Sequence, residues 1–231
     1  MTANTRTMAV MMNARRLLCL SAGTTALTIG CQLALAEAAR GLQTRAFDCG
    51  VVPVLVVLLA DNATVYLPER GMTLTRSPDS NLTEDVFADE YSRLSINGHT
   101  ARLRIAQRRY PACRENTQRA FWQAAQLRDA SFRAAAPDLS WTLDLMESGS
   151  TRVLRYAASG SATLWFRQVS AHKDAPNAWR YAGEAGTHRI RVSVSVAGPP
   201  CAVPALASTL SARVVLNLDG QEQLGCGGSV P

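Results

Sequence analysis

The sequence lacks the short motifs that mark the common classes of enzyme. It has no Gly-x-Ser-x-Gly, no His-Glu-x-x-His and no glycine-rich phosphate loop, and its histidines stand apart at positions 99, 172 and 188. No two cysteines have Cys-x-x-Cys spacing, so a zinc knuckle or a redox-active pair is not expected. We therefore expect a protein that binds a partner, with no catalytic residue, no metal site and no cofactor.

The sequence also lacks a concentrated excess of charge. It has 24 basic and 18 acidic residues, a formal net charge of +6. Arg6, Arg15 and Arg16 lie in a segment that we expect to be removed, which would leave 21 basic against 18 acidic side chains. A surplus of three, spread along the chain, is not the footprint of a nucleic-acid-binding protein. We expect no nucleic-acid partner.

Hydrophobic residues, in contrast, are plentiful. They make up 47% of the 231 residues and charged residues only 18%, so the chain can build one large or two small cores. After residue 36, however, no apolar stretch is long enough to span a bilayer. The apolar material is therefore expected inside folded domains.

Residues 1–36 are typical of a secretory signal peptide. Arg15-Arg16 precede an apolar run that reaches Leu35, and Ala34-Leu35-Ala36 offers a small-x-small cleavage site. We therefore expect export to the periplasm or cell envelope.

An alternative is lipoprotein processing at Cys31, because Thr28-Ile29-Gly30-Cys31 loosely resembles a lipobox. Threonine stands where a lipobox has leucine, and the residues that follow Cys31 stay apolar, which favours soluble release. Under the alternative, a lipid anchor would be the only attachment to a membrane.

Export places the remaining cysteines in an oxidising compartment. If Cys19 and Cys31 leave with the signal segment, four remain, and four cysteines permit three connectivities. Pairing within each half of the chain is favoured if the two halves are independent domains. The four cysteines are Cys49, Cys113, Cys201 and Cys226.

Residues 45–114 have the pattern of short antiparallel strands. Residues 51–59 are apolar on both faces, as in a buried strand, and Asn97-Gly98 between two strand-like runs is a strong hairpin signal. Residues 77–90 have the composition of a long loop. This loop carries acidic residues and no basic one: Asp79, Glu84, Asp85, Asp89 and Glu90.

The chain changes character at 115–130, where charged and amide side chains alternate with apolar ones as in a short amphipathic helix. We interpret this segment as a linker. Residues 131–231 are β-like again, with Ile190, Val192, Val194 and Val196 on one face of a strand and a turn at Asp219-Gly220. The sequence thus predicts an all-β protein with two small antiparallel domains, a barrel and then a sandwich or barrel-like domain.

Several short segments of the first half occur in an order and at a spacing that can be compared with known families. They are Phe47-Asp48-Cys49, Val65-Tyr66-Leu67, Met72-Thr73-Leu74, Ser95-Ile96-Asn97-Gly98-His99-Thr100-Ala101-Arg102-Leu103 and Tyr110-Pro111-Ala112-Cys113. Over residues 45–114 this order resembles the membrane-bound or periplasmic inhibitors of c-type lysozyme, the MliC-like family. The resemblance implies a small antiparallel β-barrel with one disulfide, here Cys49–Cys113, and c-type lysozyme as the partner.

In that family a serine and a lysine reach the catalytic carboxylates of lysozyme. The resemblance places Ser80 at the serine and Asn97 at the lysine, although Asn81 stands where the family has glycine and the family's basic-Tyr pair is missing. An amide can donate a hydrogen bond to a carboxylate, but it lacks the charge-assisted part of the interaction. Because c-type lysozymes are cationic, Asp85 and Asp89 are further candidates for contact.

The second half resembles, more weakly, a domain of uncharacterised bacterial envelope proteins. The matching residues are Arg133-Ala134, Trp141, Cys201 and Gly225-Cys226. This resemblance implies no activity.

Three functional hypotheses follow. The first is an inhibitor that plugs the lysozyme cleft with segments 77–90 and 95–99. The second is a structural or adaptor protein of the envelope that keeps the fold but has lost the inhibitory contacts. The third is a cell-wall glycan binder that uses the tryptophans Trp122, Trp141, Trp165 and Trp179.

Overall fold

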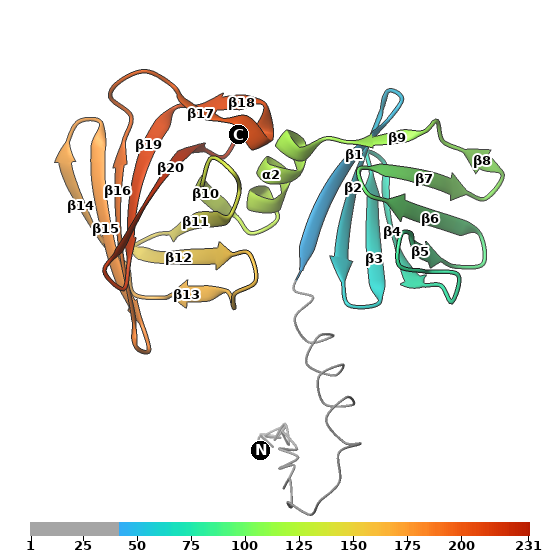
Figure 1. The fold of residues 1–231 in the computed structure, drawn as a ribbon, viewed down its shortest axis with the longest axis horizontal. Coiled ribbons are helices and arrows are strands. Elements are labelled where there is room, and N and C mark those ends of the chain that lie inside the picture. The colour runs from blue at the N-terminus through green and yellow to red at the C-terminus, as the bar shows by residue number, and fades with distance from the viewer. Residues whose placement is uncertain (1–41) are drawn as a thin grey trace, which may run out of the picture. The chain divides into compact units, whose positions relative to one another are not determined.

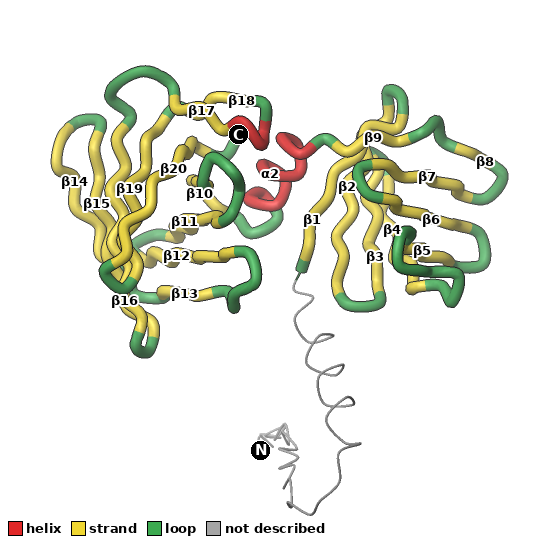
Figure 2. Tube along the Cα trace, viewed as in Figure 1, coloured by secondary structure: helices red, strands yellow, loops and turns green. Residues whose placement is uncertain are grey.

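The computed structural model describes residues 42–231. The expected signal segment 1–36 and the lipidation candidate Cys31 lie outside this range. Two nine-stranded antiparallel sheets account for most of the described chain, which is all-β with two barrel-like domains (Figures 1 and 2). In the part of the chain that the structure covers, no helix is long and apolar enough to cross a membrane.

The first sheet closes into a barrel. Along the ring the order is β6-β5-β4-β3-β2-β1-β9-β7, and a further pairing of β6 with β7 completes the circle, while β8 extends one end of β7. Closure leaves no long unpaired strand edge. The strands are β1 (Gln43–Cys49), β2 (Val52–Leu59), β3 (Asn62–Leu67), β4 (Arg70–Arg76), β5 (Asp85–Ala88), β6 (Ser92–Asn97), β7 (Thr100–Ile105), β8 (Arg108–Arg109) and β9 (Cys113–Glu115).

Alternating side chains fill the interior of this barrel. On β7, for example, Ala101, Leu103 and Ile105 point inward and are buried, while the arginines between them are exposed. The core also contains Phe47, Val54, Val56, Ala63, Val65, Leu74, Phe87, Leu94 and Ile96.

Two local predictions for this half were wrong. Residues 77–90 are not one loop, because they contain β5, whose Val86 and Phe87 are each only 1% exposed and help to close the ring. The hairpin turn between β6 and β7 lies one residue later than expected: Asn97 pairs with Thr100 as part of the sheet, and Gly98 and His99 form the turn. Gly98 has a φ of +52°, the left-handed conformation that favours glycine.

The second sheet is open and curled like half a barrel. Its order is β13-β12-β11-β10-β20-β19-β16-β15-β14, so β10 pairs directly with β20, far along the chain. The strands are β10 (Ala130–Ala135), β11 (Trp141–Ser148), β12 (Thr151–Ala158), β13 (Leu164–Phe166), β14 (Ser170–Ala175), β15 (Ala178–Ala185), β16 (His188–Ser195), β19 (Ala212–Leu218) and β20 (Gln221–Ser229).

The inner face of this sheet carries the larger of the two cores. Buried residues include Trp141, Leu143, Leu145, Leu154, Tyr156, Phe166, Ile190, Val192, Val194, Val214 and Leu216. On β20, a Cβ at Gly225 would lie 2.4 Å from the ring of Trp141, and one at Gly227 would lie 2.4 Å from the ring of Phe132. Glycines at these two positions therefore make room for the ring of Phe132 on the adjacent strand β10 and for that of Trp141 on β11, one strand further along.

The helix α2 (Thr117–Gln126) lies in the segment expected to link the domains. Asn116 caps it by accepting a hydrogen bond from the Arg119 amide at 2.9 Å. Its buried side includes Phe121, which packs with Ala135 and Cys226 of the second sheet in a small separate cluster. This cluster also contains residues of the hairpin β17 (Cys201–Val203) and β18 (Ser208–Leu210) and of the short 3-10 helix η1 (Pro204–Leu206).

The structure confirms a disulfide within each half, Cys49–Cys113 and Cys201–Cys226. Cys49 and Cys113 are direct partners across β1 and β9, so the first disulfide joins the two strands where the ring is completed. The second joins β17 to β20.

Replacing both Cys49 and Cys113 with serine should lower the free energy of unfolding by about 4 kcal/mol, because the bridge closes a loop of 64 residues. Urea unfolding of the oxidised protein and the double variant measures this difference. The pair Cys201→Ser and Cys226→Ser, with a separation of 25 residues, should cost about 3.5 kcal/mol. Equal stability of the first double variant and the parent would contradict the assigned role.

Candidate functional site

The strand register separates the two ends of the barrel. One end carries the β2–β3 turn, the loop 77–84 and the turn Gly98-His99, and we call it the 77–84 end. Asp85 pairs with Ile96, and Ser80 bonds to Val86, so Ser80, Asp85 and Asn97 all belong to this end. Asp89 follows the last residue of β5 and lies at the opposite end. The structure thus brings three of the four candidate contact residues together.

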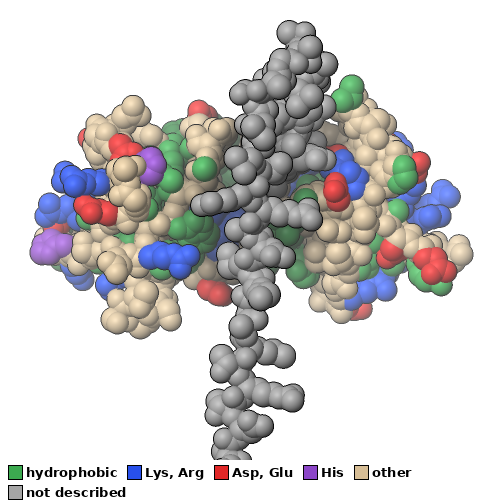
Figure 3. Space-filling view, turned by 90° about the horizontal axis from the view of Figure 1, so that it is seen from below, with side chains coloured by type: hydrophobic (Ala, Val, Ile, Leu, Met, Phe, Trp, Pro, Cys, Tyr) green, Lys and Arg blue, Asp and Glu red, His purple; other side chains and the backbone are tan. Residues whose placement is uncertain are grey.

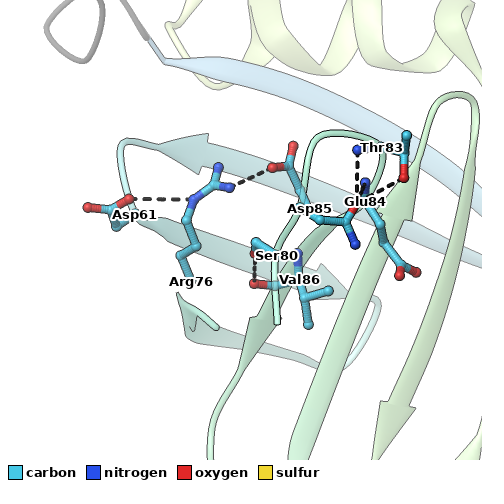
Figure 4. Close-up of polar contacts among 8 residues, drawn as sticks. Asp61, Arg76, Ser80, Thr83, Glu84, Asp85 and Val86 are labelled. Carbon is cyan, nitrogen blue, oxygen red and sulfur yellow. Dashed lines mark hydrogen bonds and ion pairs between the residues drawn. The ribbon is translucent and has the colours of Figure 1, made fainter. Parts of the chain in front are cut away.

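Ser80 uses its hydroxyl group inside the fold. The oxygen accepts a hydrogen bond from the Val86 amide at 2.9 Å and donates one to the Val86 carbonyl at 3.0 Å (Figure 4). Asn81 folds the next part of the loop, because its side-chain oxygen accepts from the amides of Thr83 and Glu84 at 2.9 and 3.0 Å. Ser80 therefore anchors the loop to β5.

The acidic residues of the loop are partly neutralised by arginines on the neighbouring strands. Arg76 lies between Asp85, at 2.6 Å, and Asp61, at 3.5 Å (Figure 4). Asp79 pairs with Arg93 of β6 at 2.8 Å. These ion pairs reduce the negative field that the sequence suggested for the loop.

The other two candidate residues differ in how free their side chains are. Asp89 caps the β5–β6 turn by accepting from the amides of Tyr91 and Ser92 at 2.8 and 2.6 Å. Asn97 is exposed, and within residues 42–231 only its backbone carbonyl takes part in a side-chain hydrogen bond, from the Thr100 hydroxyl at 2.9 Å. The Asn97 amide is therefore available to a partner.

A polar cluster that the sequence analysis missed supports the Gly98-His99 turn. Glu115 accepts two hydrogen bonds from Arg45, at 2.8 and 2.7 Å, and lies 2.7 Å from Nδ1 of His99. Arg45 also donates to the Gly98 carbonyl. Burial raises the pKa of Glu115, but the hydrogen bonds from Arg45 and His99 outweigh burial and hold it below its usual value. The residues are distant in sequence, so only the strand pairing reveals the cluster.

A second missed feature is a row of arginines on the outside of the barrel. Arg93, Arg104 and Arg109 are direct cross-strand neighbours on β6, β7 and β8, and Arg102 lies on the same face of β7. Together with Tyr110 they line a groove of about 450 Å³. The alternation of Arg102 and Arg104 in the sequence was the available signal for this row.

The charged side chains do not merge into one basic surface on the face that Figure 3 shows, where Lys and Arg are interspersed with Asp and Glu. The four tryptophans lie on different elements. Trp141 is in the second core, and Trp122 of α2 packs against the cluster that contains Phe121. Trp165, on the edge strand β13, is 44% exposed, and Trp179, on β15, is half-buried with the Lys173 ammonium 5.7 Å from its ring centre. Glycan binding stays a prediction.

Among residues 42–231, no group of three or more His, Cys, Asp and Glu side chains is placed to hold a metal ion. Comparison of the chain with protein-family models, with curated proteins and with solved structures finds no match.

Replacing Ser80 with alanine should lower the free energy of unfolding by about 1–2 kcal/mol, because the Val86 amide would lose its partner at a buried residue. Urea unfolding measures the loss. The matched control is the exposed Ser161→Ala, for which we expect almost no change. A Ser80→Ala variant as stable as the control would show that the hydroxyl does not anchor the loop.

Glu115 should make the barrel less stable in acid. Its pKa in the folded protein lies below the ordinary value of 4.5, so its stabilising effect is complete above pH 4.5 and is lost as the pH falls through the lowered value. Glu115→Gln should cost about 2 kcal/mol at pH 7 and flatten the pH dependence below 4.5. Unfolding curves between pH 2.5 and 7 test this, and parallel profiles for the two proteins would argue against it.

Proposed function

We propose that this chain is an exported envelope protein whose first barrel binds c-type lysozyme and obstructs its active-site cleft with the parts of segments 77–90 and 95–99 that lie at the 77–84 end, namely loop 77–84, Asn97 and the Gly98-His99 turn. The protein acts by occupying the cleft, without catalysis or a cofactor. The observation that carries the proposal is the grouping of loop 77–84 and the exposed Asn97 at one end of a closed, disulfide-bonded barrel. A rigid ring that holds two protruding segments side by side suits insertion into a cleft, because little ordering is needed on binding.

The charges of the barrel favour approach through this end. The arginine row on β6, β7 and β8 would repel a cationic enzyme, so the side of the barrel is a poor surface for lysozyme. At the 77–84 end, Asp61 and Asp85 pair with Arg76, and Asp79 pairs with Arg93. Glu84 is a fourth acidic residue there, and no ion pair is found for it among the described residues. An end with more acidic than basic groups attracts a cationic partner.

The second candidate is an envelope adaptor that keeps the barrel without inhibiting lysozyme. One observation favours it: the Ser80 hydroxyl is engaged with both backbone groups of Val86 and is not free for a catalytic carboxylate. The uncharged Asn97 also favours the adaptor hypothesis, since an amide binds a carboxylate less strongly than a lysine does. On the adaptor hypothesis the protein would leave lysozyme activity unchanged.

A turbidity assay of cell-wall lysis by c-type lysozyme, with and without the purified oxidised protein, separates the two candidates. We expect inhibition by the parent, and Asn97→Lys should strengthen it about tenfold, because an ammonium adds a charge-assisted bond at the same exposed position. Asn97→Ala should weaken it.

The matched control is Gln107→Lys, which adds the same charge at an exposed turn at the opposite end of the barrel. It should leave the inhibition constant unchanged. Absence of inhibition by both the parent and Asn97→Lys would reject lysozyme as the partner and leave the adaptor.

A further inference from the structure

The second domain contains a ladder of charges that its sequence does not reveal. Arg133 of β10 pairs across the sheet with Asp144 of β11, which pairs in turn with Arg155 of β12. Each arginine lies 3.2 Å from a different oxygen of the Asp144 carboxylate. The next residue in the row is Trp165 of β13, and the Arg155 guanidinium lies 5.9 Å from its ring centre. Four adjacent strands thus present one continuous row.

This ladder is buried on the face of the sheet that carries α2. The side chain of Asp144 is 0% exposed and that of Arg133 is 7% exposed, and the Arg133 guanidinium lies 4.7 Å from the ring centre of Phe121 on α2. Arg128, just after α2, is a third guanidinium beside the same carboxylate, and it is fixed by a hydrogen bond to the Ala124 carbonyl. Three cations therefore surround one anion.

Such an excess of buried positive charge is unfavourable unless something balances it. The pKa of Arg133 is lowered to about 10, mainly by burial; Asp144 opposes the shift, and the nearby Arg128 and Arg155 add to it. The pKa of Arg128 is also lowered, first by burial and then by the charge of Arg155. Both pKa shifts have the same cause: three guanidinium groups and a single carboxylate, that of Asp144, are close together and largely shielded from water.

The hydrogen bonding of Arg133 is incomplete as well. Within the described residues, its Nε and Nη1 atoms have no hydrogen-bond partner, and neither has Oδ1 of Asp144, although the two charged groups lie close together. Buried donors of this kind require a partner that the protein itself does not supply. A cavity adjoins them, and its lining includes Arg128, Arg133, Arg155 and the polar Thr142.

We propose that this cavity binds a small oxyanion, such as a phosphate or a carboxylate group, through the guanidinium groups of Arg128, Arg133 and Arg155. In this assignment Asp144 is a positioning residue: it holds Arg133 and Arg155 in place and does not touch the ligand. Guanidinium donors bind such oxygens in a planar, paired geometry, and the oxyanion neutralises the charge that Asp144 leaves unbalanced. The aromatic ring of Phe121 keeps Arg133 in place from the other side.

Titration calorimetry of the full oxidised chain tests the proposal with inorganic phosphate in one series and with acetate in another, at constant ionic strength set by sodium chloride. We expect saturable binding at one site in at least one series. Phosphate binding alone would indicate a phosphorylated ligand, and acetate binding alone a carboxylate. Heats equal to those of sodium chloride in both series would overturn the proposal.

Arg128→Gln is the first variant, because it removes a lining guanidinium and leaves the Arg133–Asp144–Arg155 ladder intact. We expect at least a tenfold loss of affinity. Arg213→Gln, which removes an exposed arginine from β19, is the matched control and should bind like the parent. Equal affinity of Arg128→Gln and the parent would contradict the assigned role of Arg128.

Asp144→Asn separates a binding site from a purely structural ladder. The variant leaves the three guanidinium groups without the carboxylate that pairs with Arg133 and Arg155, so its melting temperature should fall. Phosphate should raise that temperature more in the variant than in the parent, because the anion then offsets a larger charge. A loss of stability that phosphate does not reverse relative to sodium chloride would mean that the ladder is structural only.

Discussion

The first domain depends on the pairing of β9 with both β1 and β7. This three-residue strand supplies the hydrogen bonds that join the beginning of the ring to its end, and the disulfide between Cys49 and Cys113 fixes it at that point. Without β9 the sheet would have two open edges, and the interior side chains would lose one wall. The position of loop 77–84 beside the Gly98-His99 turn follows from closure, because a ring has only two ends on which to place its connections.

The second domain protects its sheet edges in a different way. Its sheet stays open, and the edge strand β14 is exposed along its whole length, with His172, Lys173 and Asp174 in its middle. Charged groups on an edge discourage pairing with other chains. The outer face is covered in part by α2, which shields the Arg133–Asp144–Arg155 ladder. β11 is therefore buried on both faces around Asp144: the apolar core covers its inner face, and the charged ladder lies on its outer face.

Local pattern predicted much of this architecture and little of its chemistry. Alternation identified the inward face of β16 at Ile190, Val192 and Val194, and failed only at Val196, which lies beyond the end of the strand. The Asp219-Gly220 turn is also as predicted, with both residues at positive φ. β5 was missed because its two buried residues are surrounded by loop-forming ones. The Glu115 cluster and the buried ladder were missed for another reason. Their members lie on different strands, and the register that brings them together cannot be read from any one segment of the sequence.

The central position of β20 in the second sheet has a consequence for biogenesis. β10 needs β20 as its neighbour, and the paired residues Phe132 and Ser229 are 97 positions apart in the chain. Contacts so distant in sequence form slowly, and none of them can form before the last strand of the chain is available. The first ring, whose strands all lie before residue 116, can mature earlier. Until β20 pairs, the second half exposes its apolar strands, a state that favours aggregation.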